Sequence, residues 1–223
     1  MSRAWRVMAD RMVASWTTAP QFALVREVRA DALVEMRARI AATIERQGGV
    51  RPTYTDLLVK IVATALRRHP RVNARWADGE IHENAAVDVA IATATADALL
   101  VPVIADADSL GIGEIGARRR ELVDRANAGT LGPADVSGAT FTLSNLGMHG
   151  VDAFNAIVVP GQAAILAVGR IADRVVAVDG APAVHPTLIL TLTCDHRVVD
   201  GARAAPFLED VTTLVEEPWG LLA

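Results

Sequence analysis

The sequence predicts an α+β fold whose sheet is mixed or largely antiparallel. Helical and strand-like segments are interleaved irregularly along the 223 residues, so the chain lacks the regular βαβ alternation of a parallel-sheet protein. Asp-Gly pairs at 78–79 and 179–180 each separate two strand-like runs, and this dipeptide is a strong hairpin signal. Because no repeat, low-complexity segment or linker interrupts the chain, residues 1–223 are expected to form one domain.

Elements of the first half follow from the spacing of apolar residues. Helices are expected over 3–16, 31–48 and 53–69, a strand over 21–30, a hairpin over 73–83, and β runs over 87–95 and 99–104. Asp31 is a suitable N-cap for the second helix. Pro70 ends the third helix, because proline disfavours helix in the residue before it. The two β runs are joined near Ala96 and Asp97.

Elements of the second half are predicted in the same way. A helix is expected over 112–128, strands over 139–145, 163–169, 174–178 and 184–193, and a last helix from Asp200 to just before Pro218. Asp200 is a good N-cap for that last helix, since its carboxylate can accept the first free backbone N–H groups.

Composition restricts the possible functions. Apolar residues make up 52% and aromatic residues only 4%, so Ala, Val, Leu and Ile must build the core of a globular protein. The net charge of −4 gives no electrostatic case for binding nucleic acid or an anionic membrane. The lone Cys194 excludes an internal disulfide and suits a reducing compartment. No apolar run is long enough to span a bilayer, and a cytoplasmic protein is expected.

A cluster of ionisable residues follows the apolar run 188–192. It consists of Asp195, His196, Arg197 and Asp200, and His196 is the best candidate for a general base. Strand alternation predicts Cys194 and His196 on one face and Asp195 on the other. A Cys194–His196 nucleophile pair is conceivable, but packing of Cys194 as a small apolar residue is favoured.

Ser144 lies where a predicted strand runs into a glycine turn. A serine hydrolase that uses Ser144, His196 and Asp200 is therefore one hypothesis. The nucleophile-elbow pattern Gly-x-Ser-x-Gly is absent at Ser144, which weighs against it. His149 lies in the glycine-flanked loop that follows and is a candidate to line a site.

Other motifs favour structural interpretations. Residues 111–116 match the glycine pattern of a dinucleotide-binding turn, but a glycine-rich helix start is favoured because no βαβ unit surrounds them. The arginines 118–120 point in different directions on a helix, so a solvated face is favoured over a phosphate site. Asp106 and Asp108 lack further ligands at useful spacing, and no metal site is expected. His69, His82 and His185 are interpreted as structural or surface groups.

The run from His196 to Gly201 resembles the His-x-x-x-Asp-Gly signature of coenzyme A-dependent acyltransferases. The longer run 195–202, Asp-His-Arg-Val-Val-Asp-Gly-Ala, closely resembles the catalytic domain of the dihydrolipoamide acyltransferases of 2-oxo acid dehydrogenase complexes. These enzymes are relatives of chloramphenicol acetyltransferase. Further resemblance covers residues 9–12, 53–60, 94–104, 138–151 and 154–169, which is nearly the whole chain.

This resemblance implies a chloramphenicol acetyltransferase-like fold and a homotrimer with active sites at the subunit interfaces. It implies that His196 of one subunit deprotonates the attacking thiol or hydroxyl, while Ser144 of a neighbour donates a hydrogen bond to the oxyanion. Asp200 would be structural and pair with Arg6 or Arg11. Coenzyme A is the implied acyl carrier, and assembly beyond the trimer stays open.

Departures from the family leave the acceptor open. The chain shows no lipoyl or subunit-binding domain, and the family pattern changes at Val7, Ala96–Ala98, His149, Gly161 and Pro206. The first hypothesis is a free-standing acyltransferase that acetylates a small-molecule hydroxyl, such as a tetronate intermediate of polyketide biosynthesis. The alternative is the core of a dihydrolipoamide acyltransferase. A third, an inactive structural core, is disfavoured because Ser144 and His196 are both retained.

Overall fold

A mixed sheet forms the centre of the molecule, as the sequence predicts. The computed structural model describes residues 2–95 and 98–222. Within this part the strand order is β1-β11-β9-β8-β4-β7, and β10 also pairs with β11. Their bounds are β1 (Gln21–Arg29), β4 (Val89–Ile91), β7 (Val103–Ile104), β8 (Phe141–Asn145), β9 (Ala164–Val168), β10 (Ala172–Val178) and β11 (Ala181–Asp195). Strand β8 is parallel to β4 and β9, and the other pairs are antiparallel.

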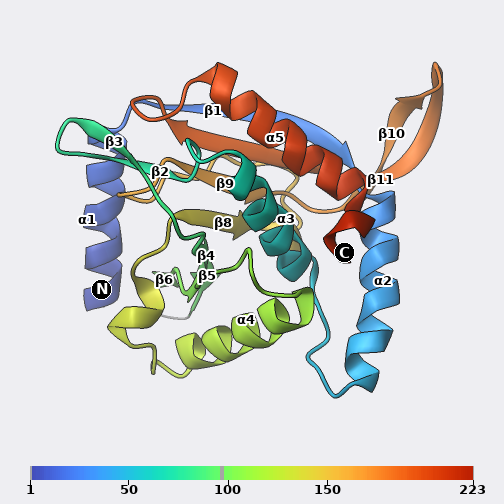
Figure 1. Cartoon of the computed structure of the whole chain (residues 1–223), viewed down its shortest axis with the longest axis horizontal. Helices are drawn as coiled ribbons and strands as arrows, with labels where there is room; N and C mark the ends of the chain where they lie inside the picture. Colours follow the sequence, from blue (N-terminus) through green and yellow to red (C-terminus); the bar gives the residue numbers. More distant parts are fainter. Residues whose placement is uncertain (1, 96–97, 223) are drawn as a thin grey trace.

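Helices surround this sheet (Figure 1). They are α1 (Arg3–Thr18), α2 (Asp31–Arg46), α3 (Tyr54–Arg68), α4 (Ile112–Asn127) and α5 (Gly201–Glu216), with 3-10 turns η1 (Pro133–Val136), η2 (Gly147–His149) and η3 (Pro218–Leu222). Helices α3 and α5 lie over one face of the sheet, where Phe141 and Phe207 pack with ring centroids 5.7 Å apart. No helix in the described part is long and apolar enough to cross a membrane.

Two short antiparallel strand pairs complete the fold. Strands β2 (Ala74–Ala77) and β3 (Glu80–Glu83) turn at Asp78 and Gly79, which both have positive φ angles as a type I′ turn requires. Strands β5 (Thr93–Ala94) and β6 (Leu99–Leu100) form the other pair. The predicted turn at Ala96 and Asp97 lies outside the described residues.

Strand β11 is longer than predicted and runs through the core. Alternate residues from Leu188 to Cys194 are completely buried, and Thr187, Thr191 and Thr193 on the opposite face are also buried. A strand covered on both faces does not show the alternation of a half-exposed strand. Burial on both faces explains why residues 188–192 form a continuous apolar run in the sequence.

Candidate active site

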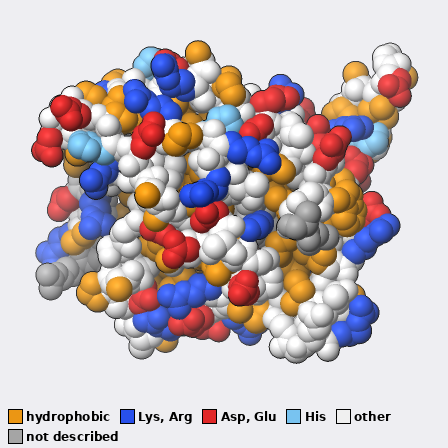
Figure 2. All heavy atoms as spheres, viewed as in Figure 1, with side chains coloured by type: hydrophobic (Ala, Val, Ile, Leu, Met, Phe, Trp, Pro, Cys, Tyr) orange, Lys and Arg blue, Asp and Glu red, His pale blue; other side chains and the backbone are white. Residues whose placement is uncertain are grey.

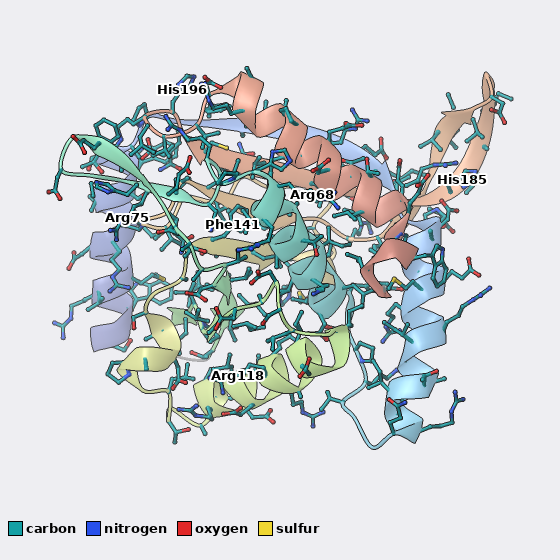
Figure 3. The ribbon with its side chains drawn as sticks, viewed as in Figure 1. Arg68, Arg75, Arg118, Phe141, His185 and His196 are labelled. Atoms are coloured by element: carbon teal, nitrogen blue, oxygen red, sulfur yellow. The ribbon has the colours of Figure 1, made fainter. Side chains whose placement is uncertain are left out.

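His196 follows the last residue of β11. Its backbone N–H donates to the Pro20 carbonyl at 2.8 Å, and its ring packs against Phe22 with centroids 4.8 Å apart. The side chain is exposed, and its ring nitrogens make no hydrogen bond within the described part of the chain. Figure 3 shows it where β11 ends and α5 begins. An exposed imidazole with free nitrogens can accept a proton from an incoming substrate.

Cys194 does not pair with His196. Strand alternation predicted the two on one face, but β11 ends at Asp195 and the following turn carries His196 to the surface. Cys194 stays completely buried, and this burial raises the pKa of its thiol to about 12. The thiolate is the reactive form of cysteine, so the nucleophile pair is excluded and the packing role is favoured.

Asp195 and Arg197 form a bridge that the sequence pattern did not indicate. The buried Asp195 carboxylate accepts hydrogen bonds from the Arg197 backbone N–H and from its guanidinium, which binds both oxygens. The guanidinium also lies over the Trp76 ring, 5.7 Å from its centroid. These contacts bracket His196 and fix the turn that carries it.

Asp200 caps α5, as predicted. Its carboxylate accepts a hydrogen bond from the Arg203 backbone N–H at 2.9 Å and also binds the Arg203 guanidinium. In the single chain the partner of Asp200 is therefore Arg203, one helical turn away, and the expected pairing with Arg6 or Arg11 stays a prediction. The backbone N–H of Arg203, then its charge, lower the pKa of Asp200, and the charge of His196 acts in the same direction.

Ser144 lies at the carboxyl end of β8, in the wall of a cavity of about 670 Å³. The side chain is half-buried, and its hydroxyl makes no hydrogen bond to any described residue. His149 lines the same cavity, as predicted, and so do Thr55, Arg119 and Asn145. The free hydroxyl can therefore donate to an oxyanion placed in this cavity.

Ser144 and His196 lie at opposite ends of the sheet. Ser144 is level with Thr191 across two strand pairs, whereas His196 follows Asp195, at the far end of β11. The offset from Thr191 to Asp195 is roughly 13 Å along the strands, with about 10 Å more across them. Strands β8 and β11 also point in opposite directions (Figure 1). One chain therefore does not form the serine hydrolase triad.

Arg119 differs from its neighbours Arg118 and Arg120. The sequence favoured a solvated face for all three, but Arg119 points inward and binds the completely buried Asp56 of α3 at 2.5 Å. Arg118 and Arg120 pair with carboxylates on the surface of α4, as expected. No local pattern in the sequence distinguishes Arg119 from its two neighbours, because its partner Asp56 lies 63 residues earlier in the chain.

The weaker motifs have structural roles. Gly111 caps α4 and its N–H donates to Glu114, which agrees with a glycine-rich helix start. Asp108 pairs with Arg67 in a loop, and no group of His, Cys, Asp and Glu in residues 2–95 and 98–222 could hold a metal ion. His69 and His185 bind Asp210 and Asp31, each at 2.8 Å. On the face shown in Figure 2, acidic and basic side chains are interspersed.

Gly161 gives a physical reason for one departure from the family pattern. Its φ angle is +87°, in the left-handed region that favours glycine. Proline, which the family resemblance leads one to expect at 161, fixes φ near −65° and could not adopt this backbone. The neighbouring Gln162 is buried and accepts a hydrogen bond from Thr142 of β8.

Known proteins match this chain over its whole length. The family model described as 2-oxoacid dehydrogenases acyltransferase (catalytic domain) matches residues 1–223. One relative is the dihydrolipoyllysine-residue acetyltransferase component 3 of the mitochondrial pyruvate dehydrogenase complex of Arabidopsis thaliana. It is 39% identical over 99% of this chain. The match covers 42% of that relative, so the chain spans less than half of its length.

Solved structures agree with this match. Dihydrolipoamide acetyltransferase of Azotobacter vinelandii has a TM-score of 0.96 at 32% identity, covering all of this chain and 92% of that one. The cubic core of the pyruvate dehydrogenase multienzyme complex has a TM-score of 0.96 at 31% identity, with the same two coverages. Chloramphenicol acetyltransferase, 13% identical with a TM-score of 0.56 over 92% of this chain and 94% of its own, confirms the predicted fold.

Proposed function

The chain belongs to the family of 2-oxoacid dehydrogenase acyltransferase catalytic domains, and we propose that it transfers a short acyl group between coenzyme A and a dihydrolipoyl thiol. In this reaction the acceptor thiol loses its proton to His196 and its sulfur attacks the thioester carbonyl. The tetrahedral intermediate then expels the coenzyme A thiolate, and His196 passes the proton to this thiolate. The acyl group changes sulfur atoms, and no other reactant is needed.

Residue spacing is the observation that supports these roles best. The study of the Azotobacter vinelandii enzyme concerns a serine, a histidine 52 positions later and an asparagine four positions after that, in its catalytic mechanism. Ser144, His196 and Asp200 have the same spacing. The acid Asp200 stands where that enzyme has the amide.

The roles follow from the surroundings of each side chain. His196 is exposed with free ring nitrogens and acts as the base. The Ser144 hydroxyl has no partner in the described residues and donates to the oxyanion without being acylated. Asp200 does not touch the substrate; it caps α5, the helix that follows the turn carrying His196.

A homotrimer supplies the missing half of the site. Because Ser144 and His196 are far apart in one chain, a second copy must bring its Ser144 to His196. An apolar surface for such a contact lies on α1, where Trp5, Val13 and Trp16 are 45–67% exposed. Trp5 and Trp16 are eleven residues apart and therefore on one helix face. The related cubic core is consistent with further assembly of trimers.

The comparisons favour a dihydrolipoyl acceptor over the hydroxyl acceptor of the first hypothesis. Relatives with 33–39% identity are dihydrolipoyllysine-residue acetyltransferases, and acetylation of a tetronate hydroxyl gains no support from them. His149 lines the cavity, and it is one of the positions at which the sequence departs from the family pattern.

Release of coenzyme A from acetyl-CoA tests the proposal. We expect rapid release with dihydrolipoamide and slow release with hydroxyl acceptors of similar size. His196→Ala should lower kcat by about 10²–10⁴-fold, because the base is lost. His82→Ala, which removes a half-buried histidine of the β2–β3 hairpin outside the cavity lined by Ser144, is the matched control and should leave the rate unchanged. Release that is faster with the hydroxyl acceptor would instead support the first hypothesis.

A further inference from the structure

Asn145, the residue after Ser144, bridges two parts of the cavity wall. Its side-chain N–H₂ donates to the Thr55 hydroxyl at 3.2 Å, and its side-chain oxygen accepts from the Gly147 N–H at 2.8 Å. The first contact joins the end of β8 to the start of α3. The second closes an Asx turn immediately after Ser144. We infer that Asn145 is a positioning residue that holds the Ser144 hydroxyl toward the oxyanion, an inference that rests on the proposed function.

The turn after Ser144 fits closely against the end of β9. The Leu146 N–H donates to the Val168 carbonyl at 3.1 Å. A Cβ atom on Gly147 would lie 3.0 Å from the Gly169 carbonyl oxygen and from Arg170 Cα. The backbone of Leu146 and Gly147, which follows Ser144 and Asn145, therefore has little freedom once Asn145 closes the turn.

Thr55 is a rigid anchor for Asn145. It lies in the first turn of α3, where Thr53 and Asp56 form a capping box. Arg119 of α4 holds the buried Asp56 from the other side. Because two helices fix this helix start, its position does not depend on Asn145.

An oxyanion donor is sensitive to small displacements. The Ser144 hydroxyl makes no hydrogen bond in the described part of the chain, so the backbone that carries it determines where it can lie. Productive geometry tolerates only about 0.5 Å of error in such a group. Loss of the Asn145 bridge should thus weaken transition-state stabilisation while substrate binding is retained.

Kinetics of the intact trimer test this inference. Asn145→Ala should lower kcat roughly ten- to hundredfold with KM for acetyl-CoA nearly unchanged. Thr55→Val should give a smaller loss of the same kind, and Thr55→Ser, which keeps the hydroxyl, should restore the rate. Thr64→Val is the matched control, because it removes a similar hydrogen bond on α3, from the Thr64 hydroxyl to the Lys60 carbonyl.

Epistasis separates positioning from a structural role. On a Ser144→Ala background, Asn145→Ala should cause no further loss of kcat, because the group that it positions is already absent. Equal losses on both backgrounds, or a loss confined to KM, would overturn the inference. Hydrogen exchange of the Gly147 N–H should also accelerate in Asn145→Ala, and unchanged exchange would contradict the bridge whether or not dihydrolipoamide is the acceptor.

Discussion

Asp200 carries two functions in one carboxylate. It accepts the backbone N–H of Arg203 as the N-cap of α5, and it binds the Arg203 guanidinium in an ion pair. The lowered pKa keeps Asp200 ionised throughout the neutral range, so both contacts persist there. Because its folded-state pKa lies below the ordinary value, ionised Asp200 favours folding above that value. This contribution is lost as the pH falls through the lowered pKa.

Asp200→Asn should separate these two functions. Asparagine is an equally good N-cap, so α5 should stay intact. The ion pair with Arg203 is lost together with the carboxylate whose pKa is lowered, so the free energy of unfolding, measured by urea denaturation, should fall less from neutral to acidic pH than in the parent protein. Asp200→Glu keeps the charge and serves as the comparison. An equal fall in the free energy of unfolding at acidic pH in the asparagine variant would contradict this role of the carboxylate.

At the scale of elements, α3 and α4 are joined by a buried ion pair. Asp56 has no exposed side-chain surface, and Arg119 is only 16% exposed. Two hydrogen bonds from Thr53 complete the environment of the carboxylate. A buried charge that loses its partner is strongly destabilising, and this pair supports the helix start that borders the Ser144 cavity.

Arg119→Met should therefore lower the free energy of unfolding by about 3–5 kcal/mol. The control Arg120→Met removes an exposed arginine on the same helix and should change it by less than about 0.5 kcal/mol. Urea denaturation of both variants at one protein concentration measures the difference, since the stability of an oligomer depends on concentration. Equal effects of the two substitutions would show that the Asp56 contact does not stabilise the fold.

At the scale of the whole molecule, the sheet keeps the two halves of the proposed site apart. β8 and β11 run antiparallel through the core, so their carboxyl ends, with Ser144 and the residue before His196, lie at opposite ends of the sheet. The proposed ring of copies would solve this geometry, because each interface would join one end of a subunit to the other end of the next. The exposed tryptophans of α1 are available to such an interface.

Mixed trimers test this arrangement directly. Ser144→Ala and His196→Ala proteins should each be nearly inactive, but co-expression should restore activity. If subunits mix at random, about a quarter of the interface sites combine an intact serine with an intact histidine. Activity of the co-expressed pair that stays at the level of the single variants would contradict a shared site.

The sequence by itself determined the local features of this protein. Apolar spacing predicted the helices and most strands, Asp78-Gly79 and Asp179-Gly180 predicted their hairpin turns, and Asp200 was recognised as the cap of α5. The run from Asp195 to Ala202 indicated the family that the matches confirm. These features depend on residues close together in the chain, so their periodicity or spacing is visible without a structure. The prediction of one catalytic domain over 1–223 stays a prediction.

Only the tertiary structure decided which distant residues meet. The register of β8, β9 and β11 separates Ser144 from His196, and no local pattern specifies that register. The inward turn of Arg119 and the bridge from Asn145 to Thr55 join segments 63 and 90 residues apart. Such contacts depend on how sheets and helices pack, because strand pairing and burial are set by the whole core. The same packing decided that Cys194 is an inert core residue while His196, two positions later, is free to act.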